Sequence, residues 1–108
     1  MQYHEQSGQA VFRALADPTR RAIIGMLTEQ SMSVNEIAAN FEMSRPAITK
    51  HLGILKDGDL ITVKANGRER INSLRPQGLK TVAEWVAQYS QFWDKKLDNL
   101  KTAIEADT

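Results

Sequence analysis

The chain has 108 residues, of which 42% are hydrophobic and 25% charged, and its formal net charge is +1. This length and composition suit one soluble globular domain with a small core. The chain has no cysteine, which excludes disulfides, thiolate metal sites and cysteine nucleophiles. No apolar run approaches membrane-spanning length and residues 1–6 lack signal-peptide character, so we expect a cytoplasmic protein without a membrane partner.

Charge is distributed unevenly along the chain. Residues 44–75 contain seven basic and three acidic side chains, a net charge of +4, whereas the remaining residues carry −3. A basic segment in an acidic remainder is expected of a DNA-binding face, although chance clustering can also produce an excess of this size.

Two helices are predicted before residue 30. Residues 5–16 form the first, and Asp17-Pro18 ends it and starts a second over residues 18–29, because Asp is a good N-cap and Pro a good first helical residue. Arg20 and Arg21 oppose the dipole of the second helix, so we expect a salt bridge to Asp17 or to a neighbouring helix, with a phosphate contact as the alternative. The predicted inward-facing residues are Val11, Phe12, Leu15 and Ala16 in the first helix and Ala22, Ile23, Met26 and Leu27 in the second.

Residues 33–56 have the pattern of a helix-turn-helix. Ser33 and Glu36 fit a capping box for a short helix over residues 34–41, and a turn of about three residues follows. Ser44 then suits the N-cap of a second helix, with Pro46 in its first turn. Apolar residues expected to face inward are Ile37, Ala38 and Phe41 in the short helix and Ile48, Leu52 and Leu55 in the second.

The opposite face of that second helix carries short or basic side chains, among them Ala47, Thr49 and Lys50, with Arg45 at its start. Such a surface can approach a DNA groove closely while its cations meet phosphates. An ordinary amphipathic surface helix is the other interpretation of this stretch alone.

Residues 60–74 predict a β-hairpin. Two runs rich in β-branched residues, 60–65 and 69–74, are joined around Asn66-Gly67, a common pairing for a tight turn, and Gly58 before them is placed to adopt a left-handed conformation. Such a hairpin after a helix-turn-helix is the wing of a winged helix, while a surface hairpin with solubilising charges is the alternative. The basic residues near its tip are Lys64, Arg68 and Arg70.

Residues 77–105 predict one long helix with an apolar stripe, roughly 40 Å in length. The first half is expected to fold back over the core, and the rest is longer than a small domain can cover, so a second subunit is expected to cover it. The predicted dimer interface consists of Val11, Phe12, Leu15, Tyr89, Trp93, Leu97, Leu100 and Ile104.

With these motifs in view, the chain resembles the bacterial ArsR/SmtB family of winged helix-turn-helix repressors. The matching stretches are residues 12–24, 33–38, 44–55 and the Asn66-Gly-Arg turn, and the most specific are Leu15-Ala-Asp-Pro-Thr-Arg-Arg and Lys50-His-Leu. The resemblance implies a mainly α fold with a small β-hairpin over residues 1–108, a homodimer built from first and last helices, and repression through a palindromic operator in double-stranded DNA. The DNA face it implies comprises Ser44, Arg45, Ala47, Thr49, Lys50 and His51, together with Arg68 in the wing.

The residues also bear on alternatives. His51 lies at the edge of the buried stripe, so a packing role and a phosphate contact are both open. With no thiolates and only His4 and His51 as histidines, no metal or other cofactor is expected, as in the metal-independent autorepressor branch.

A winged-helix module for protein contacts and a repressor with an unrecognised effector site are the alternative functions. No catalytic arrangement is found, so an enzyme is not expected.

Overall fold

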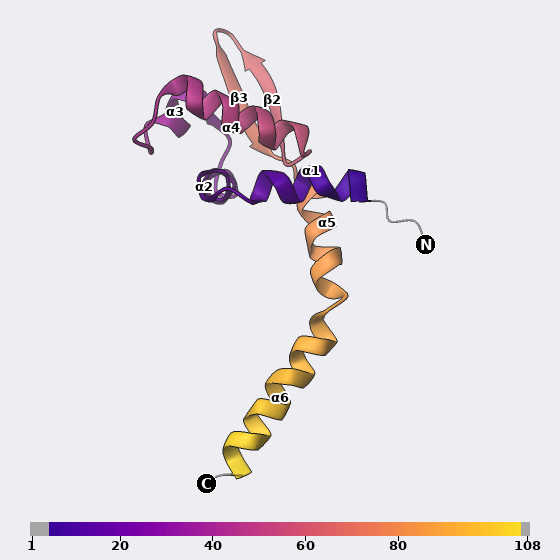
Figure 1. Cartoon of the computed structure of the whole chain (residues 1–108). Coiled ribbons are helices and arrows are strands. Elements are labelled where there is room, and N and C mark those ends of the chain that lie inside the picture. The colour runs from indigo at the N-terminus through magenta and orange to yellow at the C-terminus, as the bar shows by residue number, and fades with distance from the viewer. Residues whose placement is uncertain (1–4, 107–108) are drawn as a thin grey trace.

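The computed structural model describes residues 5–106, which form six helices and a small sheet within that range (Figure 1). The elements, in chain order, are α1 (Glu5–Leu15), α2 (Pro18–Leu27), β1 (Met32–Ser33), α3 (Val34–Ala38), α4 (Arg45–Asp57), β2 (Ile61–Asn66), β3 (Glu69–Leu74), α5 (Pro76–Ala87) and α6 (Ser90–Ala106). The helices before residue 60 match the predicted ones to within a few residues, the usual uncertainty of helix ends.

The core lies between α1, α2, α4 and the first residues of β2. Ile48, Leu52 and Leu55 of α4 are buried, as the spacing predicted, and they pack with Ile23 of α2 and Leu60 in one apolar cluster. This cluster seats α4 firmly, because each large apolar side chain removed from water contributes about 1.5–3 kcal/mol.

The buried face of α2 was predicted partly wrongly. Ala22 is exposed, and Ile24 is buried together with Ile23 and Leu27. Leu27 lies three positions after Ile24 and four after Ile23, the spacings that share a face of a helix, so the observed stripe is rotated away from Ala22. Met26 is half-buried at the edge of the stripe.

The sheet has three antiparallel strands in the order β1-β3-β2, and β1 was not predicted. Two residues are too short a run for a period-of-two signal, so only pairing with β3 defines β1. The predicted hairpin is confirmed, but its turn is one residue further on. Asn66 pairs with Glu69, and the two loop residues are Gly67, with φ 65°, and Arg68. A glycine with positive φ at the first loop position is the arrangement of a type II′ turn.

The end of α4 also differs from the prediction. Gly58 has φ −83°, and Asp59 has the left-handed conformation, with φ 58°. The Asp59 N–H donates to the Lys56 carbonyl at 3.0 Å and the Leu60 N–H to the Leu55 carbonyl at 3.0 Å, which together form a Schellman motif. Glycine is favoured at 58 for a different reason: a Cβ there would lie 3.0 Å from the Ala10 carbonyl oxygen, so α1 passes close to this end of α4.

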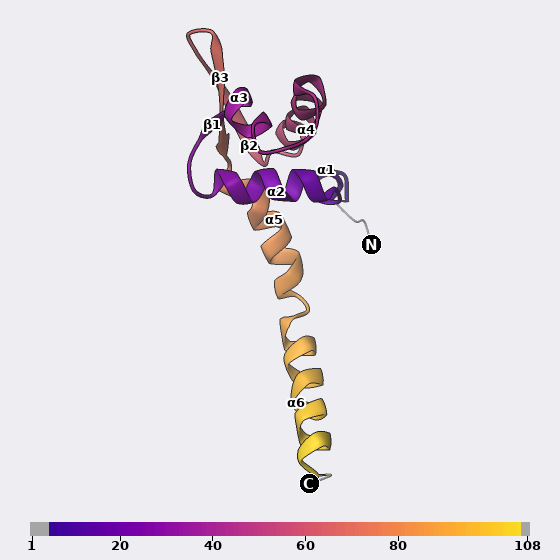
Figure 2. The ribbon, with the colours of Figure 1, turned by 90° about the vertical axis from the view of Figure 1, so that its left-hand side faces the viewer.

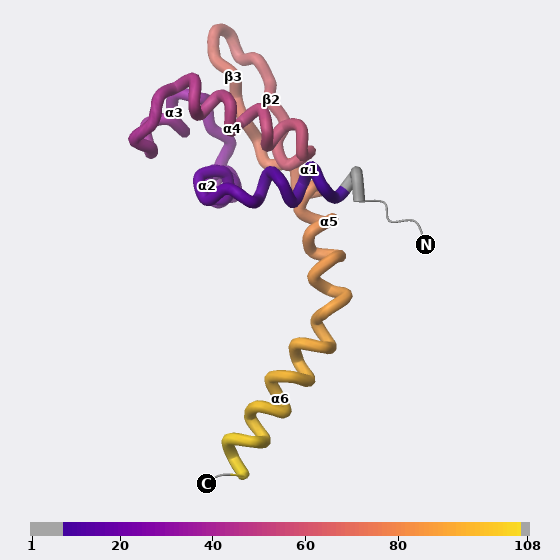
Figure 3. The backbone as a smooth tube through the Cα atoms, in the orientation of Figure 1, coloured from indigo at the N-terminus to yellow at the C-terminus, as the bar shows by residue number. Residues whose placement is uncertain are grey.

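The predicted long helix over residues 77–105 is interrupted. α5 ends at Ala87 and α6 begins at Ser90, with a visible change of direction between them (Figures 2 and 3). At the junction the N–H groups of Gln88 and Tyr89 donate to carbonyls only three residues back, and the Ser90 hydroxyl donates to the Ala87 carbonyl at 2.9 Å. A serine hydroxyl that competes for a backbone carbonyl in this way disturbs the regular helical hydrogen bonding. Residue spacing alone does not show such an interruption.

The C-terminal helices extend away from the rest of the molecule. Leu79 and Val82 of α5 pack against the core, but α6 has no buried residue and extends away in both views (Figures 1 and 2). The radius of gyration is 18.5 Å, compared with about 13 Å for a compact domain of this length. The chain therefore covers only the first part of its C-terminal apolar stripe by itself.

The close approach of α5 to the end of α4 can be tested at Gly78. A Cβ at Gly78 would lie 2.4 Å from the Asp59 carbonyl oxygen, whereas a Cβ at Gly25 in α2 would meet nothing within 4 Å. Gly78→Ala should lower the free energy of unfolding by about 1–3 kcal/mol, because a backbone atom must move. Gly25→Ala, the control, should be neutral or stabilising by up to about 1 kcal/mol. Urea denaturation measures both, and an unchanged midpoint for Gly78→Ala would contradict this packing.

Candidate nucleic-acid interface

The N-terminal half of α4 presents a polar, basic surface. The Ser44 hydroxyl caps the helix by accepting a hydrogen bond from the Ala47 N–H at 3.2 Å. Arg45, Thr49 and Lys50 are exposed and Ala47 is half-buried. Within residues 5–106, the side chains of Arg45, Thr49 and Lys50 make no hydrogen bond or ion pair. These groups are free to contact an external partner while the helix beneath them is held by its buried face.

The hairpin carries the second group of basic residues. Lys64, Arg68 and Arg70 are all exposed, and Arg68 occupies the turn itself. Lys64 pairs with Ile71, so Lys64 and Arg70 lie on opposite faces of the hairpin, since neighbouring residues in a strand alternate. The structure therefore surrounds the tip with positive charge instead of gathering the three side chains on one side.

His51 has a structural contact. Its side chain is 22% exposed, and its Nδ1 lies 3.2 Å from Nη1 of Arg20. A guanidinium only donates hydrogen bonds, so Nδ1 accepts this one and the neutral ring carries its proton on Nε2. The contact gives His51 a packing role in the fold, and it uses Nδ1 alone, so the phosphate contact stays a prediction.

Arg20 binds a neighbouring helix, as one of the predictions had it, but through carbonyl oxygens and not through a salt bridge. Its side chain donates to the carbonyl oxygens of Ala14 (2.7 Å) and Arg13 (3.0 Å) at the end of α1, and it makes no ion pair with Asp17 among the described contacts. Arg21 likewise donates to the Leu15 carbonyl at 2.8 Å. The sequence did contain a signal: arginines against the dipole of their own helix can still bind the C-terminal carbonyls of the preceding one.

Asp17 starts α2 by accepting a hydrogen bond from the backbone N–H of Arg20 at 3.1 Å. This hydrogen bond is the main reason that the pKa of the Asp17 carboxyl is lowered, and burial opposes the shift. The pKa is lowered further by the Arg20 charge and, when His51 is protonated, by the imidazolium, whose Nδ1 lies 3.9 Å from Asp17 Oδ2. Because the folded-state pKa is lowered, the cap contributes stability at neutral pH, and this contribution is lost as the pH falls through that pKa.

The residues predicted for a dimer interface are in two different environments. Val11 is buried in the core of its own chain, which leaves it almost no surface for a partner, and Leu15 is half-buried. Phe12 is 38% exposed and packs edge-to-face on Trp85, with ring centroids 5.4 Å apart. The remaining predicted residues are all exposed: Tyr89, Trp93, Leu97, Leu100 and Ile104.

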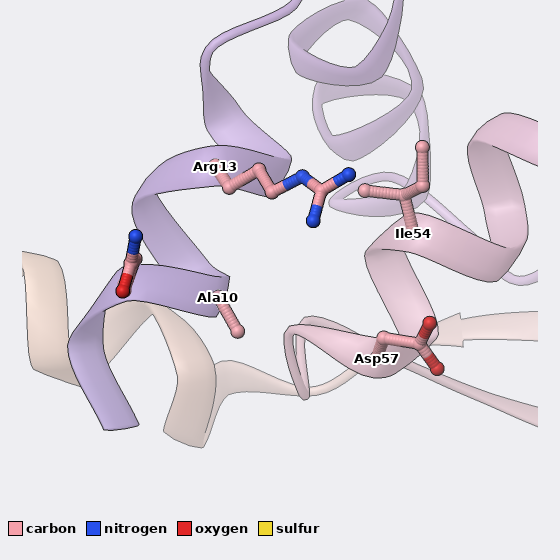
Figure 4. A pocket seen from close by; sticks show the side chains of 5 residues that line it. Ala10, Arg13, Ile54 and Asp57 are labelled. Carbon is pink, nitrogen blue, oxygen red and sulfur yellow. The ribbon is translucent and has the colours of Figure 1, made fainter. Parts of the chain in front are cut away.

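A hollow of about 380 Å³ lies between α1 and the C-terminal part of α4, at the end away from Arg45. It is lined by Gln9, Ala10, Arg13, Ile54 and Asp57, and the Arg13 guanidinium points across it toward Ile54 (Figure 4). Within residues 5–106, no group of three or more His, Cys, Asp or Glu side chains is placed to hold a metal ion. In the same range, no helix is long and apolar enough to cross a membrane.

Comparison with known proteins agrees with this arrangement. The helix-turn-helix domain family matches residues 15–64. The HTH-type transcriptional regulator Rv2034 of Mycobacterium tuberculosis is 32% identical over 102 residues, 94% of this chain and 92% of that protein. The transcriptional repressor SdpR of Bacillus subtilis is 34% identical over 87 residues, 81% of this chain and 97% of that protein.

Solved structures give the same result. The crystal structure of an ArsR family transcriptional regulator, RHA00566, superposes with a TM-score of 0.78 at 33% identity, covering 87% of this chain and 97% of that one. Helix order, the hairpin after the helix-turn-helix and these relatives over nearly the whole length lead to one conclusion: the chain belongs to the ArsR family of winged helix-turn-helix transcriptional regulators.

Proposed function

We propose that this repressor recognises a specific operator sequence through α4, and that its hairpin contacts the same duplex and stabilises the complex. The observation that carries the proposal is the N-terminal half of α4, where unpaired Arg45, Thr49 and Lys50 stand on a helix whose other face is buried. In helix-turn-helix proteins the recognition helix lies in the major groove with its N-terminal residues on base edges. Regulation of transcription by such contact needs no catalytic group.

We further propose that the protein acts as a homodimer on a palindromic operator. The support is the exposed apolar stripe of α5 and α6, including a hollow of about 460 Å³ lined by Trp85, Val86, Tyr89, Phe92 and Trp93. A contiguous apolar surface of this kind is rare on a monomer and is normally covered by a partner. Two-fold pairing would set the half-sites about 34–36 Å apart, one turn of DNA.

Selection of bound sequences from random duplex DNA, with purified full-length protein, tests the function directly. A palindromic motif with half-sites one helical turn apart is the expected result. A motif with one half-site would support DNA reading without dimerisation. Recovery of no motif, with weak binding that is equal on all sequences, would overturn the proposal and favour a winged-helix module for protein contacts.

Different residues of α4 should contribute sequence specificity and general affinity for DNA. Arg45 at the helix start can grip a guanine edge with two hydrogen bonds, so Arg45→Ala should cost about 1–3 kcal/mol on the operator and relax preference at one position of each half-site. Lys50→Ala should weaken binding to all sequences alike and reduce the salt slope by about 1. Fluorescence anisotropy on matched and mismatched duplexes measures both, and an unchanged sequence preference in Arg45→Ala would contradict this assignment.

The wing should respond to the width of the minor groove. Arg68 lies in the hairpin turn, and a narrow A·T-rich groove concentrates negative potential that attracts arginine. Arg68→Ala should therefore lose more affinity for operators with A·T-rich flanks than for those with G·C-rich flanks. Lys95→Ala on α6, which is also exposed, is the control for lost charge. Thermal stability should be unchanged in both variants, and equal losses on the two flanks would count against groove insertion.

The dimer should depend on the stripe of α6. Trp93 and Leu97 are about 60% exposed in the single chain, and covering such side chains contributes about 1.5–3 kcal/mol each. Trp93→Glu with Leu97→Glu should produce monomers and abolish tight operator binding, although no DNA-facing residue is changed. Lys95→Glu, on the opposite side of the same helix, should leave the dimer intact. Sedimentation equilibrium decides: a wild-type protein that is monomeric at micromolar concentration would disprove the dimer.

A further inference from the structure

Arg20 connects three elements of the fold through one side chain. Its Nε and Nη2 donate to the carbonyls of Ala14 and Arg13 at the end of α1, and its Nη1 donates to Nδ1 of His51 in α4. Its backbone N–H is held by the Asp17 carboxylate at the start of α2. Three of these four contacts are partly buried, with donor–acceptor distances of 2.7–3.2 Å.

The Arg20 contacts give α4 a directional restraint, which its apolar packing does not provide. Burial of Ile48, Leu52 and Leu55 holds α4 against the core, but the hydrophobic effect has no preferred direction. A hydrogen bond weakens steeply when its angle or distance changes. The Arg20–His51 contact therefore restrains how far α4 can slide or rotate relative to the end of α1.

We propose that Arg20 is a positioning residue for operator recognition, which acts through His51 and does not touch DNA. This inference rests on the proposed reading of DNA by α4. Arg45 lies six residues before His51, so a small rotation of α4 at His51 moves the Arg45 side chain relative to a base edge. Specific contacts require that geometry, whereas attraction to phosphates tolerates its loss.

The chain offers a matched control in the next residue. Arg21 also donates from α2 to a carbonyl at the end of α1, that of Leu15, but it makes no described contact with α4. Arg20→Gln and Arg21→Gln remove the same charge, and each removes side-chain hydrogen bonds to α1, two in Arg20→Gln and one in Arg21→Gln. Both retain the backbone N–H groups of α2, so the Asp17 cap remains possible. Only Arg20→Gln removes the donor to His51.

The experiment measures the affinity of full-length protein for the selected operator and for an unrelated duplex, at several salt concentrations. Arg20→Gln should lose about tenfold on the operator, the size expected for disturbed coupling between packed elements. It should bind the unrelated duplex as the wild type does, with an unchanged salt slope. Arg21→Gln should match the wild type on both duplexes. A salt slope reduced by about 1 would mean a direct phosphate contact, and equal operator affinity for Arg20→Gln and wild type would overturn the proposal.

Two variants of His51 give an independent test that leaves Arg20 in place. His51→Asn keeps a hydrogen-bond acceptor near the position of Nδ1, whereas His51→Leu keeps bulk and has no acceptor. Asparagine is the poorer helix former, so a purely structural role predicts that Asn does more harm. If Arg20 positions α4 through His51, the reverse order is expected. Operator affinity is then retained in His51→Asn and falls about tenfold in His51→Leu. The opposite order, or equal losses, would overturn the proposal.

The double variant Arg20→Gln with His51→Leu shows whether the two residues act together. If Arg20 acts through His51, the double variant should lose about as much operator affinity as either single one, because the shared contact is already gone. Losses that multiply to about a hundredfold would mean independent roles and would overturn the proposal. If wild type selects no operator at all, the proposed function fails instead, so the two failures are distinguishable.

Discussion

The burial of one face of α4 is the constraint on which the structure depends. Ile48, Leu52 and Leu55 lie in the same cluster as residues from α1, α2 and β2, so one set of contacts joins nearly every element before α5. Because that face is buried, Arg45 and Lys50 must point outward. The core that stabilises the fold is thus also what presents the surface for DNA.

Polar contacts restrain the orientation of α4 on that core. Arg20 ties the end of α1 to His51, and Ser44 caps the start of the helix whose side chains would meet bases. Each contact contributes only about 1 kcal/mol to stability. Their larger effect is on orientation, since Arg45 must be placed to within a fraction of an ångström to form two hydrogen bonds with a base edge.

The C-terminal helices are a different case. α5 contacts the core with its first turns, and after the interruption at Gln88 and Tyr89 the chain runs outward without cover. Trp85 of α5 and Tyr89 at the junction have ring centroids 5.3 Å apart, and they line one hollow together with Phe92 and Trp93 of α6. A partner that covers this surface must therefore match a bent apolar stripe.

Elements that depend on local chemistry could be predicted from the sequence. The caps at Asp17, Ser33 and Ser44 and the period of Ile48, Leu52 and Leu55 are local patterns, and each was found as predicted. The hairpin and the exposed basic residues followed from β-branched runs and charge.

Features that require contact between distant residues could not be predicted from the sequence and became visible in the fold. Helical spacing could not show that Arg20, 31 residues earlier in the chain, contacts His51. The two-residue β1 exists only through pairing with β3, and glycine is favoured at position 58 because α1 passes close to it. The break between α5 and α6 involves no glycine or proline. Residue spacing and composition depend on interactions between residues that are close in the sequence. The features named here depend instead on which atoms of sequence-distant residues come within hydrogen-bonding or van der Waals distance.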